Sequence, residues 1–207
     1  PHDADEERHR DSRPQAHALT RNDYAIASRT IGAVLFPSAK RVMYVATPRT
    51  PKISSELLNQ VMCGQAIMLA DGGMGSLIQQ AGLSQIHDVP DLLNLTHASD
   101  ICTLQRGYVE AGSDCIATNT FSSNRLKLAN HDASVDELYA AAAQIARDAG
   151  APLVAGDIGP TGSLLAPLGE LGFEEAYDIF AEQARAACAA GCDLIFLETF
   201  ADLLEAK

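Results

Sequence analysis

Three acidic side chains, Asp71, Asp157 and Glu198, each follow a short run of apolar residues. In folds built from parallel strands, the active site lies at the carboxyl ends of the strands, so side chains placed there come together. Polar groups at such positions must be hydrogen-bonded or used by a ligand, because burying them unpaired costs free energy. The pattern predicts a carboxylate-lined site, although a structural hydrogen-bond network explains any single residue equally well.

Asp71 and Glu198 are suited to hold an ammonium group between them. Beside Asp71, the glycines Gly72 and Gly73 allow main-chain N–H groups to approach a substrate carboxylate closely. Together these groups would recognise the zwitterionic end of an amino acid, but residue types alone do not distinguish it from a sugar or a metal ion. The glycine run is a weak phosphate-loop signal, because it lacks both G-x-G-x-x-G and the lysine of a Walker motif.

A repeat positions these side chains. Four segments share a small residue, a glycine, a short spacer and an apolar run, and their glycines are Gly64, Gly112, Gly150 and Gly191, roughly forty residues apart. Glycine accepts the positive φ that often ends a helix. Each repeat is therefore predicted to be a helix, a glycine cap, a turn and a buried strand.

The amphipathic segments between the glycines are predicted to be helices over residues 96–111, 134–149 and 173–190. Ser134 and Glu137 form an S-x-x-E capping box at the start of the second. Apolar strands separated by such helices indicate a parallel sheet covered by helices, in a βα barrel or a doubly wound sheet. A (β/α)8 barrel needs about 250 residues and eight strands. This chain has four predicted strands and ends within an expected helix over residues 203–207, so we expect an α/β fold that is the first half, (βα)4, of a TIM-type barrel, truncated.

Residues 1–60 differ in kind from the rest. Charges and prolines interrupt every apolar run, and we expect an irregular or disordered extension, with possible short strands at 33–36 and 42–46 and a lead-in helix over 54–61. Residues 61–207 are expected to form the half barrel.

Composition excludes several classes of protein. The formal net charge is -12, and an acidic surface repels phosphate backbones, so nucleic acid is not an expected partner. No apolar run approaches the roughly 18 residues that a membrane span needs, so no membrane partner is expected. The charged first residues do not resemble a secretory signal, which predicts a cytoplasmic protein. The five cysteines are irregularly spaced, so we expect free thiols, with Cys188 and Cys192 packed rather than bound to metal.

Several motifs in collinear order resemble the homocysteine S-methyltransferase family. They are residues 71–76, 92–96, 108–114, 118–121, 124–128, 159–162 and 193–199. The Leu-Leu-Asn-Leu-Thr and Thr-Asn-Thr-Phe forms look most like the homocysteine-binding module of cobalamin-dependent methionine synthase. The resemblance covers roughly residues 64–207, and it is the order of the motifs that makes a chance match improbable.

The resemblance implies a (β/α)8 barrel in which three cysteines hold a zinc ion and homocysteine binds as a zinc thiolate, which attacks a methyl donor. In the methionine synthase branch that donor is methylcobalamin on a separate domain, recharged by methyltetrahydrofolate. Asp71 and Glu198 match the carboxylates that bind the homocysteine amino group. Gly72 and Gly73 match main-chain contacts near its carboxylate, and Asn119 and Thr120 match pocket-lining positions.

The sequence departs from the family in one respect. The family's zinc ligands are a lone Cys and a Cys-Cys pair, and no Cys-Cys pair occurs here. We therefore assign no catalytic residue and no metal ligand to this chain, expect the zinc ligands beyond residue 207, and expect the chain alone to be inactive.

Other functions stay open at this point. The methyl donor could be betaine or S-methylmethionine, as in relatives with the same barrel. The chain could also be a non-catalytic half-barrel binding or scaffold protein. An unrelated barrel enzyme such as an aldolase is disfavoured, since no strand-end lysine is available for a Schiff base.

Overall fold

The computed structural model describes residues 56–83 and 89–207 of the chain. The predictions for residues 1–55, which are the irregular extension and two short strands, lie outside the described residues. The elements are α2 (Glu56–Met62), α3 (Met74–Gln80), the 3-10 helix η1 (Pro90–Leu92), α4 (Leu93–Thr96), α5 (Ala98–Glu110), β1 (Cys115–Ala117), α6 (Val135–Asp148), β2 (Leu153–Ile158), α7 (Phe173–Ala189) and β3 (Leu194–Leu197). Helix α2 matches the predicted lead-in helix, so the last residues of the predicted irregular region are helical.

The three strands form one parallel sheet in the order β1-β2-β3. Cys115 pairs with Leu153, and Ala155 pairs with Leu194. Each strand is separated from the next by a helix, α6 or α7, as parallel connections require. The predicted α/β class, with its parallel strands and connecting helices, is confirmed.

The first predicted strand is reduced to a single bridge. Ala70 pairs in parallel with Cys115, and Asp71 N donates a hydrogen bond to Cys115 O at 3.0 Å. Residues 67–70 therefore run beside β1 in the same direction, without forming a regular strand.

The helix predicted over residues 203–207 is wrong. These residues form a turn in which Ala206 N donates to Asp202 O at 3.1 Å. One such bond does not offset the cost of nucleating a helix. Within the described residues, the predicted (βα)4 pattern is thus three strands, one bridged segment and no helix after β3.

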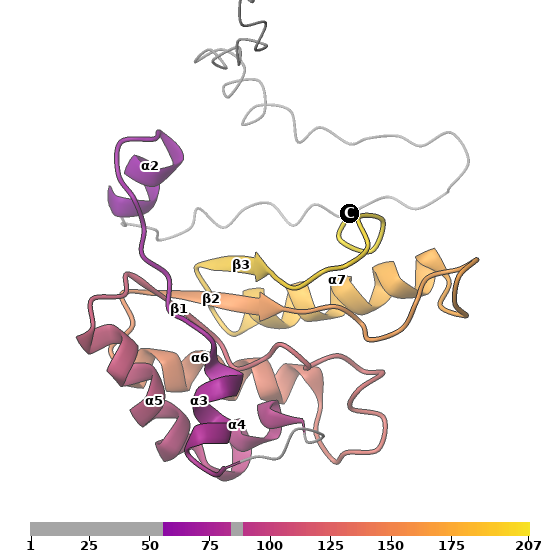
Figure 1. Cartoon of the computed structure of the whole chain (residues 1–207), viewed down its shortest axis with the longest axis horizontal. Coiled ribbons are helices and arrows are strands. Elements are labelled where there is room, and N and C mark those ends of the chain that lie inside the picture. The colour runs from indigo at the N-terminus through magenta and orange to yellow at the C-terminus, as the bar shows by residue number, and fades with distance from the viewer. Residues whose placement is uncertain (1–55, 84–88) are drawn as a thin grey trace, which may run out of the picture. The chain divides into compact units, whose positions relative to one another are not determined.

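Helices α5, α6 and α7 lie on the same side of the sheet (Figure 1). Ile116 and Val154 pack against Ala143 and Ala146 of α6. On the opposite side, alternate strand residues gather in a second cluster that includes Cys115, Leu153, Ala155, Met68 and Phe196. The sheet is therefore apolar on both faces, as parallel sheets are.

The two outer segments of the sheet keep apolar side chains exposed. Ile67 and Leu69 are 91% and 55% exposed on one edge, and Ile195 and Leu197 are 42% and 57% exposed on the other. Among the described residues nothing covers these side chains. We refer to Ile67, Leu69, Ile195 and Leu197 as the apolar edges.

The glycines of the repeat end their helices as predicted. Gly64, Gly112, Gly150 and Gly191 have φ of 68°, 100°, 93° and 78°. After each glycine, the next N–H donates to a carbonyl in the last turn of the helix, as Ser113 N does to Tyr108 O at 3.1 Å. This is the Schellman arrangement, which satisfies helix carbonyls and turns the chain toward the next strand.

Two aspartates fix how the strands start. Leu69 N donates to Asp114 Oδ2 at 2.9 Å, while Asp114 N donates to Leu69 O at 2.7 Å. Asp193 makes the same pair of bonds with Val154, both at 2.8 Å. Each aspartate thus accepts a hydrogen bond from the N–H of one residue on the neighbouring segment through its carboxylate, and donates its own N–H to the C=O of the same residue. We call these two pairs the aspartate braces.

The predicted capping box opens α6. Ser134 Oγ accepts a hydrogen bond from Glu137 N at 3.2 Å, and Ser134 N donates to Glu137 Oε2 at 3.0 Å. All five cysteines are free thiols, as predicted. In residues 56–83 and 89–207, no helix has the length and apolar character to cross a membrane.

A paired substitution tests the packing between β2 and α7. Gly156→Ala would place a Cβ 2.7 Å from Ala187 Cβ, and we expect it to lower the free energy of unfolding by about 1–3 kcal/mol. The control Gly107→Ala, in α5, meets no atom within 4 Å and is expected to raise that free energy by up to about 1 kcal/mol, because alanine favours helix. Urea unfolding measures both. Equal stability of Gly156→Ala and the unmodified chain would contradict the packing described here.

Candidate functional site

Asp71 lies where the bridged segment ends. Its Oδ2 accepts a hydrogen bond from Ala117 N at 3.1 Å. Burial raises the pKa of its carboxyl to about 6, the backbone N–H groups oppose that shift, and the charge of Glu198 adds to it. Asp71 is therefore a fixed carboxylate at the carboxyl edge of the sheet, and a nearby cation would favour its ionised form.

Glu198 follows β3 directly and is held by its backbone. Its N–H donates to Ile158 O at 3.2 Å, and its side chain is exposed. The next residue, Thr199, has a φ of 62°. A β-branched residue in this left-handed region is strained, and such strain gathers at functional sites.

Asp157 is the most deeply buried of the three acidic residues predicted at the strand ends. It is 5% exposed, and its Oδ1 has no hydrogen-bond partner among the described residues. The pKa of its carboxyl is raised to about 8, chiefly by burial and then by the charges of Glu198, Asp91 and Asp71, in that order. Asp71, Asp157 and Glu198, which we call the carboxylate cluster, thus lie within electrostatic range of one another.

Gly72 and Gly73 lie between Asp71 and α3. Neither N–H donates a hydrogen bond to another described residue. A Cβ on Gly72 would lie 3.0 Å from the hydroxyl oxygen of Tyr108, and that hydroxyl donates to Gly73 O at 3.5 Å. Burial, followed by the charge of Asp71, raises the pKa of Tyr108. The absence of a side chain at Gly72 therefore lets Tyr108 of α5 lie against the main chain beside the cluster.

Asn119 follows β1, and its side chain is engaged by other parts of the chain. Asn119 Nδ2 donates to Pro90 O at 2.9 Å, and Asn94 Nδ2 donates to Asn119 O at 2.7 Å. These bonds join the loop after β1 to η1 and α4. The geometry gives Asn119 a positioning role, and its contact with a substrate stays a prediction.

Thr120 is fully buried. Its Oγ1 lies 2.6 Å from Thr118 Oγ1 and donates to Asp157 O at 2.8 Å. The hydroxyl is thus used to hold β2 at Asp157, and lining of a pocket by Thr120 likewise stays a prediction.

The sequence reasoning missed Asp91, which accepts hydrogen bonds from Ser122 N at 2.8 Å and Ser123 Oγ at 2.7 Å. No pattern around Asp91 indicated this role.

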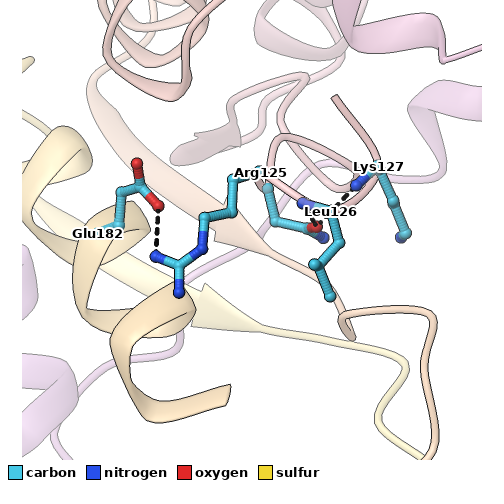
Figure 2. Close-up of polar contacts among 5 residues, drawn as sticks. Arg125, Leu126, Lys127 and Glu182 are labelled. Carbon is cyan, nitrogen blue, oxygen red and sulfur yellow. Dashed lines mark hydrogen bonds and ion pairs between the residues drawn. The ribbon is translucent and has the colours of Figure 1, made fainter. Parts of the chain in front are cut away.

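The rest of the loop after β1 is held by the contacts in Figure 2. Arg125 Nη1 lies 3.1 Å from Glu182 Oε2 of α7, and Asn124 Oδ1 accepts hydrogen bonds from Leu126 N and Lys127 N, both at 3.1 Å. The loop that carries Asn119 and Thr120 is therefore attached to α7 as well as to η1 and α4.

The described residues do not fit a zinc site. Residues 56–83 and 89–207 contain no group of three His, Cys, Asp or Glu side chains that could hold a metal ion. Burial raises the pKa of Cys115 to about 12 and that of Cys192 to about 11. Both shifts oppose the thiolate form that binds metal.

Comparison with known proteins gives the family. Residues 68–207 match the profile of the homocysteine S-methyltransferase family. The methionine synthase of Mycobacterium tuberculosis (strain ATCC 25618 / H37Rv) is 33% identical over 158 residues, which is 69% of this chain and 13% of that protein. The methionine synthase of Mycobacterium leprae (strain TN) is 30% identical over 180 residues, which is 80% of this chain and 15% of that protein. The chain thus spans only a small part of these two relatives.

A solved structure shares the fold. The metallated form of the homocysteine methyltransferase MmuM from Escherichia coli aligns with a TM-score of 0.60 at 22% identity, over 72% of this chain and 59% of that chain. At this identity the likeness shows the fold alone. The family profile covers well over half of the sequence. This chain belongs to the homocysteine S-methyltransferase family.

Proposed function

We propose that this chain binds the amino-acid end of homocysteine, as part of a methionine synthase-type enzyme that transfers a methyl group to the homocysteine sulfur. The observation that carries the proposal is that Asp71 and Glu198 follow the ends of their segments at the carboxyl edge of the sheet, where the charge of Glu198 acts on Asp71, in a chain of this family. An α-ammonium group is a cation of the size that two such carboxylates can share.

In the proposed binding mode, Asp71 and the main-chain N–H groups of Gly72 and Gly73 contact the amino-acid end of homocysteine. Asp71 Oδ2 already accepts a hydrogen bond from Ala117 N, so its orientation is fixed before a ligand arrives, which lowers the entropy lost on binding. Gly72 and Gly73 have N–H groups that no described residue uses, and these would donate to the substrate carboxylate. Asn119 and Thr120 hold the neighbouring loop in place.

The described residues correspond, in this proposal, to the first half of a (β/α)8 barrel. The apolar edges support this, because in a closed barrel a further strand and its helix lie beside each outer segment and would cover such side chains. The zinc ion that the family implies does not fit the described side chains, so we assign it no ligand here. Cobalamin and methyltetrahydrofolate would likewise act through other domains.

Isothermal titration calorimetry with L-homocysteine tests the proposal. We expect the 207-residue chain to bind it, and we expect Glu198→Gln to weaken binding by about tenfold, since a charge-assisted hydrogen bond is lost. Glu110→Gln, at the exposed last residue of α5, is the control and should bind normally. The thiol acid that lacks only the amino group of homocysteine should bind the unmodified chain and Glu198→Gln equally weakly. Equal affinity for the two ligands would sink the proposal.

The pH dependence of binding tests Asp71. Its pKa is raised to about 6, so the carboxyl is largely neutral below that pH and attracts an ammonium group poorly. We expect the affinity for homocysteine to rise from about pH 5 to about pH 7. Asp71→Asn should weaken binding and make this rise less steep, while Asp132→Asn, at an exposed loop residue, should leave the rise unchanged. A rise that is equally steep in Asp71→Asn and in the unmodified chain would rule out Asp71 as one of its sources.

A further inference from the structure

A buried oxygen in the carboxylate cluster lacks a partner. Asp157 Oδ1 forms no hydrogen bond with any described residue, although the residue is only 5% exposed to solvent. An unpaired polar atom at this depth is costly, because it has lost its hydrogen bonds to water and gained none in return. The rest of Asp157 is well satisfied, so poor local packing does not account for the unpaired oxygen.

The backbone of Asp157 is held from three directions. Its N–H donates to Thr118 Oγ1 at 3.0 Å, and its carbonyl accepts from Thr120 Oγ1 at 2.8 Å and from Tyr139 Oη at 2.7 Å. Gln183 Nε2 of α7 lies 3.4 Å from the same tyrosine oxygen. These bonds fix the main chain at Asp157, so the unpaired Oδ1 does not result from a loosely held backbone.

The direction of the side chain follows from strand alternation. Leu153 and Ala155 belong to the cluster on the face away from the helices, and Asp157 is the next residue of that series in β2. Residue Asp157 pairs in register with Phe196, two residues before Glu198. The carboxyl group of Asp157 therefore lies on the same face of the sheet as Phe196, and the charges of Glu198 and Asp71 both act on it.

We propose that Asp157 is a third binding group for the α-ammonium of homocysteine, accepting a hydrogen bond through its unpaired Oδ1 beside Asp71 and Glu198. The inference rests on the proposed function and adds a residue to it. An ammonium group has three N–H donors, so three carboxyl groups can each accept one of them. Asp157 would thus help to select an amino acid over a thiol that lacks the amine.

A metal ion is a poorer occupant for this cluster. Within the described part of the chain no three His, Cys, Asp or Glu side chains are close enough together to hold one. Metal ligands must all lie within about 2–2.6 Å of one ion, whereas an ammonium group reaches its acceptors through N–H bonds and allows them to stand further apart. We therefore assign an organic cation, and not a metal ion, to this cluster.

Binding would also move a proton. Asp71, Asp91, Tyr139 and Glu198 face Asp157 from the surrounding elements, and none of these groups carries a positive charge. In the empty site the carboxyl therefore keeps its proton at neutral pH, since its pKa is raised to about 8. An ammonium beside Oδ1 favours the carboxylate, so the O–H bond breaks and the proton passes to solvent.

The first test measures that proton with the unmodified 207-residue chain. Calorimetric titrations in two buffers of different ionisation enthalpy give the number of protons released at neutral pH. We expect release with L-homocysteine and none with the thiol acid that lacks the amino group. Homocysteine binding without proton release would overturn the role of Asp157. Failure to bind homocysteine at all would instead overturn the proposed function.

The second test replaces the carboxyl group by an amide of the same shape. Asp157→Asn should bind L-homocysteine about tenfold or more weakly and should release fewer protons. Glu110→Gln, at the exposed last residue of α5, is the charge-matched control and should behave as the unmodified chain. An Asp157→Asn chain that melts at the unmodified temperature yet binds and releases protons normally would overturn the proposal. If Asp157→Asn does not fold, proton release by the unmodified chain decides.

Discussion

The aspartate braces set the register on which the rest of the structure depends. Because side chains alternate along a strand, a slip of one residue would move every side chain to the other face of the sheet. Asp114 and Asp193 prevent this slip, since each grips both the N–H and the C=O of one residue on the neighbouring segment. The third repeat has Pro152 at the matching place and no brace. Its strand is instead joined through Leu153 N, which donates to Asp114 O at 3.1 Å.

The register of the strands in turn brings the residues of the carboxylate cluster to one edge of the sheet. Asp71 reaches Ala117 N only because Ala70 pairs with Cys115, and Asp157 and Glu198 end adjacent strands. Bringing three carboxyl groups to one edge opposes folding, because burial and mutual repulsion disfavour their ionised forms. The fold tolerates this because Asp157 is held through its backbone by Thr118, Thr120 and Tyr139. Stability thus resides in the main chain of the site, and the carboxyl groups are left to interact with a ligand.

Local signals in the sequence predicted the repeating parts of the fold. The glycine caps and the Ser134–Glu137 box depend on neighbouring residues, so residue types suffice to find them. The first strand was predicted to be regular, but it forms a single bridge. Its apolar run does not indicate how many backbone hydrogen bonds the neighbouring strand can form with it. The prediction of a helix over residues 203–207 was wrong because helix stability depends on packing against other segments as well as on local propensity.

The site was only partly predictable. Carboxylates at strand ends are visible in the sequence, and Asp157 stands out as the one charged residue in a buried apolar strand. The enclosure of Thr120 and the use of Asn119 in bonds to Pro90 and Asn94 depend on contacts between segments distant along the chain. Such contacts leave no local pattern. Family resemblance named these two positions, but only the three-dimensional arrangement separates residues that hold the loop from residues free to meet a ligand.

The apolar edges also govern the colloidal behaviour of the chain. Its net charge of -12 keeps molecules apart through repulsion that acts over the Debye length. Exposed apolar side chains on the two outer segments of a sheet attract each other at much shorter range. Added salt screens the repulsion and leaves the attraction intact. Concentrated solutions of this chain should therefore stay clear at low ionic strength and scatter light as salt is raised, the reverse of a protein whose association depends on ion pairs.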